Sequence, residues 1–500
     1  MVPPFSPKDR TRLKITDTLL RLERGGEELI LTDYVNLRPL YVGQGRDYVT
    51  RFLKAAATLK TRRKIIMAFP RDVNLLDTLL NHGIIVPDGS PSAGPLNYSF
   101  EGPDFHNKRS VTLYLLISQA CNMGCTYCLN GRKTYQTDRI LNMDKAMAFK
   151  SVETCLENVA AGGRLEIIFF GGEPLLNWPV AKETITYCEE SLRKKHPDKK
   201  IVYQFTSNLS FLPEDLIEWA RRFQIAFLCD VDGPADIHDT CRPFKDGSPS
   251  HEAIAGNIRR LADAGLRVEL RATVTSRNHD RLPEIAEHHR ALGGRACAFV
   301  PVNPVNSDED ILPEEVLPSP RKMIEGLTCL YERKIWPEGD LYPFNQYAAR
   351  IRPGSGTVLG CGVPCGNTVI VDVNGDAYPC IYLVGIRKFH LGNIMHGDYP
   401  NKKLLKHLYD SLHVDRLEDC RNCSWRYLCG GGCPLWRLTV VDNPRASGSI
   451  IDYCRGISCE YTRRIIELLL WDKARESASS LMHNLDGNET ERPSNVLCHR

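Results

Sequence analysis

The chain has 500 residues, and its 64 basic and 61 acidic side chains leave a net charge of +3. A chain of this length is expected to hold about three domains. So small a net charge gives no reason to expect nucleic acid or an acidic membrane surface as a partner. No apolar run is long enough to span a bilayer, and the N-terminus lacks the features of a secretory signal. We therefore expect a cytoplasmic protein.

The N-terminal 100 residues differ in rhythm from the rest of the chain and predict a small module of their own. Short strand-like and helical patterns alternate here. They are Glu28–Thr32, Tyr48–Ala57, Arg62–Phe69, Val73–Asn81 and Ile84–Val86. The order predicts a winged-helix-like module. Because it contains no basic recognition helix, a peptide is favoured over DNA as its ligand.

Residues 108–305 alternate apolar, β-branched runs with segments of helical period. The six strand-like runs are Val111–Ile117, Leu165–Phe170, Ile201–Thr206, Ile225–Asp230, Val268–Val274 and Ala296–Val302. Six strands, each followed by a helical crossover, make a parallel βα repeat. We therefore expect an α/β fold built on a partial (β/α)6 TIM-type barrel. A doubly wound open sheet is the alternative.

Unusual residues follow the first four of these strands. A cysteine octad, Cys121–Cys128, comes after the first strand, and Gly171–Pro174 comes after the second. Ser207 and Asn208 follow the third strand, and Asp230–Pro234 closes the fourth. In βα barrels the chemistry is carried by the loops after the strands. We expect these four segments to meet at one mouth of the barrel.

The octad reads Cys-Asn-Met-Gly-Cys-Thr-Tyr-Cys and places three thiols in the spacing C-x3-C-x2-C. Three thiolates hold only three irons of a four-iron cluster, and the fourth iron is left open to a ligand. Clusters kept for electron transfer alone usually have four cysteines. Cys121, Cys125 and Cys128 resemble the cluster ligands of radical S-adenosylmethionine (SAM) enzymes. A zinc knuckle is the alternative interpretation.

The resemblance to radical SAM enzymes implies a SAM site on the neighbouring loops. In that family a Gly-Gly-Glu-Pro motif receives the methionine amine of SAM. Here the motif consists of Gly171, Gly172, Glu173 and Pro174. Glu173 would accept charge-assisted hydrogen bonds from the SAM ammonium, and Ser207 and Asn208 suit the ribose hydroxyls and the carboxylate.

The motif after the fourth strand resembles a segment of one radical SAM subgroup. Asp230 stands where that subgroup has a serine, which puts a SAM contact there in doubt. Arg242 matches the subgroup's arginine and would bind the SAM carboxylate bidentately, with a surface ion pair as the alternative. A catalytic base should line the mouth of the barrel. Asp230, Asp232 and His238 are the candidates, and the sequence does not choose among them.

A second group of cysteines lies near the C-terminus and resembles the SPASM pattern of auxiliary clusters. The resemblance implies two four-iron clusters. One would be held by Cys361, Cys365, Cys380 and Cys433, and the other by Cys420, Cys423, Cys429 and Cys454. Cys459 can replace Cys454 in the second set. Taken without the octad, such cysteines would also suit zinc.

These resemblances imply a radical SAM maturase of a peptide or protein. Anaerobic sulfatase maturases carry an aspartate base directly after the cysteine that corresponds to Cys380, and here that residue is Ile381. The run Asp376–Gly385 looks more like peptide maturases that build thioether cross-links. Among these, the chain is most similar to maturases of the quinohemoprotein amine dehydrogenase small subunit. These join cysteine sulfur to aspartate or glutamate methylene carbons.

The implied cofactors are SAM and three [4Fe–4S] clusters, one that binds SAM and two auxiliary ones. Reductive cleavage of SAM would supply a 5′-deoxyadenosyl radical that attacks the polypeptide. The expected partners are a cysteine-containing peptide or small protein and an electron donor such as flavodoxin or ferredoxin. Formylglycine formation and epimerisation are alternative activities, and a zinc-binding scaffold is the alternative without catalysis.

The expected domain boundaries follow from these patterns. Residues 1–100 form the peptide-recognition module, 108–305 the partial barrel and 351–465 the auxiliary-cluster domain. Residues 306–350 contain a stretch rich in proline and acid and are expected to be a linker. The polar tail 474–500 is expected to be disordered.

Overall fold

The computed structural model describes most of the chain but not all of it. The described residues are 12–15, 20–24, 27–31, 40–42, 46–81, 83–88, 90, 108–128, 141–305, 311–352, 356–441 and 443–485. Within these ranges, no helix combines the length and the hydrophobicity needed to cross a membrane. Of the predicted tail, residues 486–500 lie outside the described part.

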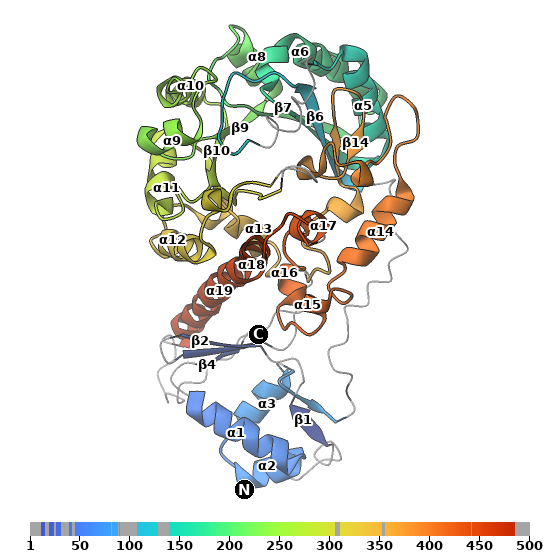
Figure 1. The fold of residues 1–500 in the computed structure, drawn as a ribbon. Coiled ribbons are helices and arrows are strands. Elements are labelled where there is room, and N and C mark those ends of the chain that lie inside the picture. The colour runs from blue at the N-terminus through green and yellow to red at the C-terminus, as the bar shows by residue number, and fades with distance from the viewer. Residues whose placement is uncertain are drawn as a thin grey trace.

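A mostly parallel sheet of nine strands organises the larger part of the molecule (Figure 1). All six predicted strands form, and each pairs in parallel with its neighbour in the chain. They are β6 (Lys108–Ser118), β7 (Val159–Gly171), β8 (Lys200–Thr206), β9 (Ala226–Asp230), β10 (Val268–Val274) and β11 (Ala296–Pro301). The strand order follows the chain order, as a partial barrel requires.

The helices between these strands lie on the outside of the sheet (Figure 1). They are α5 (Lys145–Glu157), α6 (Trp178–Tyr187), α7 (Arg193–Lys195), α8 (Leu216–Phe223), α9 (Ala235–Cys241), α10 (His251–Asp263) and α11 (Leu282–Ala291). Local signals set their ends. Asp144 caps α5 by accepting a hydrogen bond from the Met147 amide, and Gly265, two residues after α10, takes a positive φ of 77°.

Aromatic side chains fill the space between neighbouring strands. Phe169, Phe205 and Phe227 come from β7, β8 and β9, and all three are completely buried. Phe169 and Phe205 stack with their ring centroids 4.6 Å apart, and Phe205 and Phe227 stack at 6.2 Å. Each buried ring contributes about 1.5–3 kcal/mol through the hydrophobic effect. This packing holds the strand ends that carry the site.

The sheet is wider than the sequence predicts, because segments after β11 add to both edges. Strand β12 (Leu341–Tyr342) pairs in parallel with β11. At the other edge β13 (Thr368–Val371) pairs in parallel with β6, and β14 (Ala377–Tyr378) pairs antiparallel with β13. The cysteine-rich segment therefore takes part in the sheet that forms the barrel.

The segment 306–350, predicted as a linker, contains regular structure. Helix α12 (Pro320–Glu332) and helix α13 (Phe344–Ala348) flank β12. The start of α12 has a local cause, because Ser319 accepts from the Lys322 amide and Pro320 occupies the first turn. The stretch rich in proline and acidic residues, which suggests a linker, lies before this helix.

The C-terminal part consists of short helices and one long one. They are α14 (Lys402–Leu412), α15 (Glu418–Arg421), α16 (Arg426–Cys429), α17 (Leu435–Thr439), α18 (Gly448–Arg455) and α19 (Thr462–Leu485). Helix α19 continues past residue 474, where the sequence predicts disorder. Alanine, arginine, glutamate, leucine and methionine favour a helix in this stretch, and glycine first appears at Gly487.

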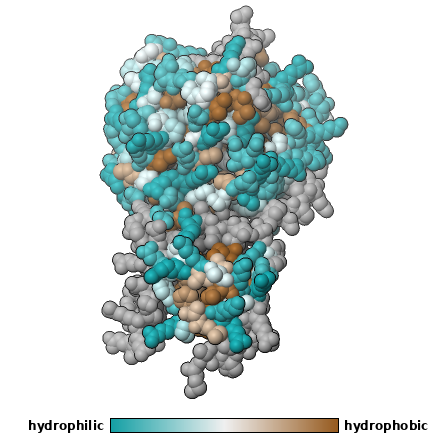
Figure 2. Space-filling model, turned by 60° about the horizontal axis from the view of Figure 1, so that its bottom comes forward, coloured by the Kyte–Doolittle hydropathy of each residue, from teal (hydrophilic) through white to brown (hydrophobic). Residues whose placement is uncertain are grey.

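The N-terminal module contains the predicted elements and additional strands. Strand β1 (Leu13–Ile15) pairs with β5 (Ile85–Pro87), and β2 (Leu20–Arg24), β3 (Glu27–Leu31) and β4 (Leu40–Val42) form an antiparallel sheet. Helices α1 (Arg46–Leu59), α2 (Arg62–Ala68) and α3 (Val73–Asn81) complete the module. The three-stranded sheet lies at the end of α19 (Figure 1). Figure 2 shows hydrophobic residues gathered on the module, within a mainly hydrophilic face.

Candidate active site and cluster-binding cysteines

Backbone hydrogen bonds join the loops after β6 and β7. The amide of Gly172 donates to the Ser118 carbonyl at 2.8 Å, and the amide of Glu173 donates to the Ala120 carbonyl at 2.7 Å. Gly171 has a φ of 134°, and a Cβ there would lie 2.3 Å from the Ser118 oxygen. Glycine is therefore required where the two loops approach each other. Pro174 follows at the start of a short 3-10 turn, Pro174–Asn177.

The cysteine octad is held against the segment that follows α9. The amide of Gly124 donates to the Pro243 carbonyl at 2.8 Å, and the amide of Thr126 donates to the Cys241 carbonyl at 3.0 Å. The thiols of Cys121 and Cys128 lie close enough to Cys125 for both to act on its pKa, and Cys128 also acts on that of Cys121. Burial raises the pKa of Cys125 to about 12. The loop thus brings the three predicted cluster ligands together.

Glu173 is completely buried and collects three hydrogen bonds. The Ser207 hydroxyl donates to it at 2.8 Å, the Asn208 amide at 2.8 Å and the Leu175 amide at 2.9 Å. Burial raises the pKa of Glu173 to about 7, although the three hydrogen bonds act to lower it. The Ser207 hydroxyl therefore already donates its hydrogen bond to Glu173. The Asn208 side chain donates to the Asn122 side-chain oxygen at 2.9 Å. The structure brings these predicted residues together and links them to the octad loop.

Asp230 forms an ion pair that the sequence does not predict. Arg271, its neighbour on β10, donates to both carboxylate oxygens at 2.6 and 2.9 Å. Arg242 approaches the same carboxylate at 3.6 Å. Burial would raise the pKa of Asp230, but the two arginines lower it to about 2. Arg271 is a charged residue inside the predicted strand Val268–Val274. This unusual position is the sequence feature from which its role could have been suspected.

Asp232 and Tyr127 form a buried network with Arg242. The Tyr127 hydroxyl donates to Asp232 at 2.5 Å and accepts from Arg242 at 2.8 Å. Asp232 also accepts from the Thr273 amide at 3.0 Å, and burial raises its pKa to about 6. The octad aromatic, Tyr127, therefore orients the predicted SAM arginine. Within the described chain, the Nε of Arg242 is buried and has no hydrogen-bond partner.

His238 is completely buried behind this network. Its Nδ1 accepts from the Asp232 amide at 3.3 Å, and its Nε2 lies 3.2 Å from the Ser250 hydroxyl. Burial and the nearby Arg242 lower its pKa to about 2. The three predicted bases thus lie together, but two are enclosed and Asp230 is paired with arginines. The assignment of a catalytic base among them stays a prediction.

The residues at this mouth fit the cofactors that the sequence implies. Three thiols share one loop, and Arg242 offers an unpaired N–H of the kind that a carboxylate accepts. No three His, Cys, Asp or Glu side chains of the described residues are grouped as a single metal ion requires. A four-iron cluster carries its thiolates on separate iron atoms, so its ligands are spaced more widely than those of one ion.

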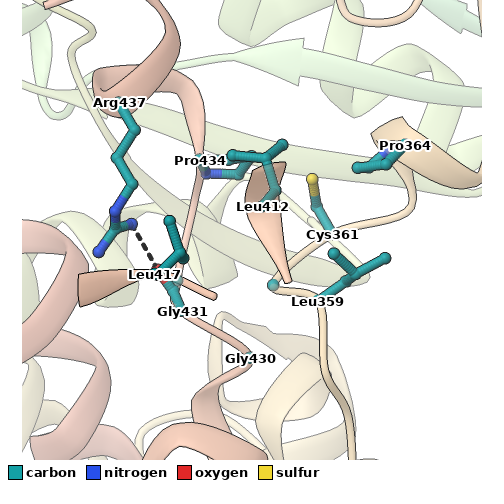
Figure 3. A pocket seen from close by; sticks show the side chains of 11 residues that line it. Leu359, Cys361, Pro364, Leu412, Leu417, Gly430, Gly431, Pro434 and Arg437 are labelled. Atoms are coloured by element: carbon teal, nitrogen blue, oxygen red, sulfur yellow. Dashed lines mark hydrogen bonds between the residues drawn. The ribbon is translucent and has the colours of Figure 1, made fainter. Parts of the chain in front are cut away.

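The first auxiliary set converges around Cys433. The charges of Cys365 and Cys433 act on the pKa of Cys361, and those of Cys380 and Cys433 act on Tyr382. Figure 3 shows Cys361 across a small pocket from Arg437, and Arg437 donates to the Gly431 carbonyl at 2.9 Å. The four predicted ligands of this set therefore share one region.

In the second predicted set, Cys459 lies with the other cysteines and Cys454 does not. Cys423 and Cys459 act on the pKa of Cys420, Cys423 acts on that of Cys459, and all three thiols act on that of Cys429. Arg437 donates to the sulfur of Cys420 at 3.8 Å, and Arg463 donates to that of Cys423 at 3.3 Å. Cys454 instead lies near Cys433, the one cysteine that acts on its pKa. The sequence alone does not show which of Cys454 and Cys459 lies with the second set, because this depends on the fold.

Three consecutive glycines separate the two sets. Gly430, Gly431 and Gly432 follow Cys429 and precede Cys433, with φ values of 65°, 84° and 70°. A Cβ on Gly430 would lie 2.4 Å from the Leu359 oxygen, and one on Gly432 would lie 2.6 Å from the Ser458 oxygen. Left-handed backbone and close packing both require glycine here. The turn directs neighbouring cysteines to different sets.

Comparison with known proteins gives a match within the barrel. Residues 115–289 match the model of the radical SAM superfamily. This segment runs from β6 to α11 and contains the octad, the Gly171–Pro174 motif and Arg242. This part of the chain is therefore similar to radical SAM enzymes.

Similar proteins extend beyond this segment. The cysteine-type anaerobic sulfatase-maturating enzyme of Clostridium perfringens is 23% identical over 343 residues, covering 65% of this chain and 89% of that protein. A structure of anSMEcpe with bound AdoMet has a TM-score of 0.59 at 21% identity, covering 75% of this chain and 99% of that one. A related structure of anSMEcpe also contains a peptide. Streptococcus suis SuiB has a TM-score of 0.51 at 12% identity, covering 87% of this chain and 99% of SuiB.

Proposed function

We propose that the chain is a peptide maturase that forms thioether cross-links between cysteine sulfur and carbon atoms of a polypeptide substrate. When bound, the cluster and SAM supply the radical chemistry that activates a carbon–hydrogen bond. Glu173 and Arg242 would hold the amine and the carboxylate of SAM, and Tyr127 and Asp232 would keep Arg242 in place. The auxiliary cysteines would hold the two further clusters, which would supply an acceptor for the excess electron.

The observation that carries this proposal is the residue after Cys380. Ile381 stands there, and its side chain packs against Leu116, Ile370 and Tyr378 in a hydrophobic cluster. An apolar side chain in the core takes up no proton. The position that is occupied by a base in sulfatase maturases therefore cannot serve that role in this chain. This favours attack by a substrate thiolate over oxidation of a substrate cysteine.

The substrate linkage that we favour joins cysteine sulfur to an aspartate or glutamate methylene carbon, as in maturases of the quinohemoprotein amine dehydrogenase small subunit. The N-terminal module would hold one part of the polypeptide by strand addition. This raises the local concentration of the segment to be modified. The hydrophobic residues on the module provide a surface for such a contact (Figure 2).

Formylglycine formation is the second candidate. It is favoured by the similarity to a cysteine-type sulfatase-maturating enzyme over 65% of this chain. Both candidates place a peptide in the site, as in the anSMEcpe structure that holds one. They differ in the fate of the substrate cysteine, which keeps its sulfur only in a thioether.

The test combines the chain with a small cysteine-containing polypeptide, sought among the neighbouring open reading frames, under anaerobic reducing conditions with SAM. We expect the product to lose two hydrogen atoms per cross-link and its cysteines to resist alkylation in mass spectrometry. A product that has lost cysteine sulfur would support formylglycine formation instead. The Cys125→Ala variant is the control and should yield neither product nor 5′-deoxyadenosine.

A further inference from the structure

A cavity of about 210 Å³, open to solvent on one side, lies between the mouth of the barrel and the cysteine-rich part. Its lining includes residues after β11, among them Val302 and Asn303, and Tyr342 of β12. It also includes Trp436 of α17 and Tyr461, at the end of the π-helical turn Gly456–Tyr461. For comparison, an engineered cavity of about 150 Å³ already admits benzene. This cavity is therefore large enough for a side chain.

Two hydrogen-bond donors in the wall of this cavity have no partner. Trp436 is 6% exposed and Tyr461 is 5% exposed. Among the described residues, nothing accepts from the Trp436 indole N–H or pairs with the Tyr461 hydroxyl. A buried polar group without a partner costs about 1–3 kcal/mol. Two such groups in one wall indicate a ligand that supplies acceptors.

Other tyrosines of the same wall do have partners. The Tyr453 hydroxyl donates to the Val302 carbonyl at 2.8 Å. The Tyr347 hydroxyl lies 3.1 Å from the Thr462 hydroxyl. The missing partners of Trp436 and Tyr461 are therefore specific to these two side chains.

The cavity lies beside the cluster ligands but is not their site. Of the first auxiliary set, Cys433 lines it, whereas Cys361, Cys365 and Cys380 do not. Tyr382, two residues after Cys380, also lines the cavity, and so do residues 300–304 at the carboxyl end of β11. The cavity is thus next to the auxiliary cysteines and to the edge of the sheet that carries the SAM-side loops.

The chemistry of the wall restricts the ligand. Among the described residues, no aspartate, glutamate, lysine, arginine or histidine lines the cavity, and most of the lining side chains are aromatic, aliphatic or proline. A carboxylate would be buried without a cation to pair with it, which is costly. An uncharged acceptor, such as an amide carbonyl next to an apolar group, satisfies both donors at no such cost.

We propose that this cavity binds an apolar residue of the substrate polypeptide and that Tyr461 and Trp436 donate hydrogen bonds to its amide carbonyls. The inference rests on the proposed function, because it places a peptide substrate beside the SAM site. It adds a preference for one kind of substrate: a polypeptide with an uncharged apolar residue next to the position of modification, which the cavity would bind.

The test measures binding of two small probes to the full-length, cluster-reconstituted chain by ligand-observed NMR. N-acetyl-L-phenylalaninamide offers a ring and amide carbonyls, and toluene offers the ring alone. In Tyr461→Phe we expect the amide probe to bind about three- to tenfold more weakly, the effect of one lost hydrogen bond, and toluene to bind unchanged. Trp436→Phe should weaken the amide probe similarly.

Tyr453→Phe is the matched control, because that hydroxyl already has a protein partner. It should bind both probes like the wild type but unfold at a lower temperature, since the Val302 carbonyl loses its donor. Tyr461→Phe should unfold at the same or a higher temperature, because it removes an unpaired hydroxyl. Equal amide affinity in wild type and Tyr461→Phe, or no binding of the amide probe, would overturn the inference. Wild-type SAM cleavage, measured separately, tests the proposed function without bearing on this result.

Discussion

Cys459 and Cys454 lie five positions apart in the chain yet face different surroundings. Cys459 joins Cys420, Cys423 and Cys429, and two arginines point to the sulfurs of this set. Cys454 is 4% exposed and lines the cavity next to Cys433. The two thiols therefore have different cysteine neighbours.

Substitution of these two cysteines should give opposite results. We expect Cys459→Ala to lose about four irons per chain, the content of one cubane cluster, when the protein is reconstituted anaerobically. Cys454→Ala is the control and should keep the wild-type iron and sulfide content. Equal loss in both variants would contradict the assignment of the second set.

Asp372, in the turn between β13 and β14, makes a pH-dependent contribution to the free energy of unfolding. It accepts from the amides of Asn374 at 2.8 Å and Asp376 at 3.1 Å. Burial raises its pKa to about 6. Because the folded pKa lies above the unfolded one, about 3.9, the folded state binds more protons between these values. The free energy of unfolding therefore falls as the pH rises through this window.

The variant Asp372→Asn should remove this slope. Asparagine keeps an oxygen that can accept from both amides, but it does not titrate. We expect the urea-unfolding free energy of the variant to vary less with pH between about 4 and 6 than that of the wild type. The same slope in both proteins would show that other groups cause it.

At the scale of elements, the glycine turn between α16 and α17 separates the two cysteine sets. Gly432→Ala places a Cβ 2.6 Å from the Ser458 oxygen and forces an alanine to a φ of 70°. A left-handed backbone alone costs about 1–2 kcal/mol. We expect a lower unfolding temperature and loss of iron from the auxiliary sites, measured by calorimetry and iron analysis.

Gly448→Ala is the matched control for this prediction. Gly448 begins α18, and a Cβ there meets nothing within 4 Å. Alanine favours a helix over glycine by about 1 kcal/mol, so this variant should keep its iron and be no less stable. Similar behaviour of the two alanine variants would argue against a role for the turn.

The elements of the barrel could be predicted because each carries its own signal. Runs such as Leu165–Phe170 are apolar and β-branched, and helices such as α10 end at a glycine. Strand β12 has two residues, too few for any periodicity. The pairing of β13 with β6 depends on residues far apart in the chain. No local pattern contains that information.

The site could be predicted in its residue types but less well in its geometry. Glu173 and Arg242 were predicted because their motifs resemble those of radical SAM enzymes. The partners of Asp230 could not be identified in this way, since Arg271 lies within a strand on the neighbouring segment. Whether a carboxylate is paired or free depends on which strands adjoin. The three candidate bases were therefore predicted without knowledge of the side chains that pair with them.

At the scale of the whole molecule, the N-terminal module contacts the C-terminal helix. Leu22 of β2 is 8% exposed and belongs to the hydrophobic cluster that includes Leu469 and Trp471 of α19. The sheet β2–β4 lies at the end of this helix in Figure 1. A charge at position 22 should weaken this contact while leaving the barrel intact.

We expect Leu22→Asp to reduce modification of the polypeptide more strongly than cleavage of SAM, because the module would no longer present the substrate at the barrel. Both reactions can be followed in one assay by mass spectrometry and by 5′-deoxyadenosine release. Met67→Asp places the same charge on the module at a residue that is 64% exposed, and it serves as the control. Equal loss of both reactions in Leu22→Asp would indicate damage to the barrel instead.

The pairing of β13 with β6 affects the synthesis of this protein on the ribosome. Lys108, at the start of β6, donates from Nζ to the Cys365 carbonyl at 2.6 Å across a separation of 257 residues. Until that distant segment has been translated, one edge of β6 has no strand to cover it. Such an edge can pair with other nascent chains. Slow translation of this region would therefore prolong exposure, and overproduction together with chaperones should increase the yield of intact protein.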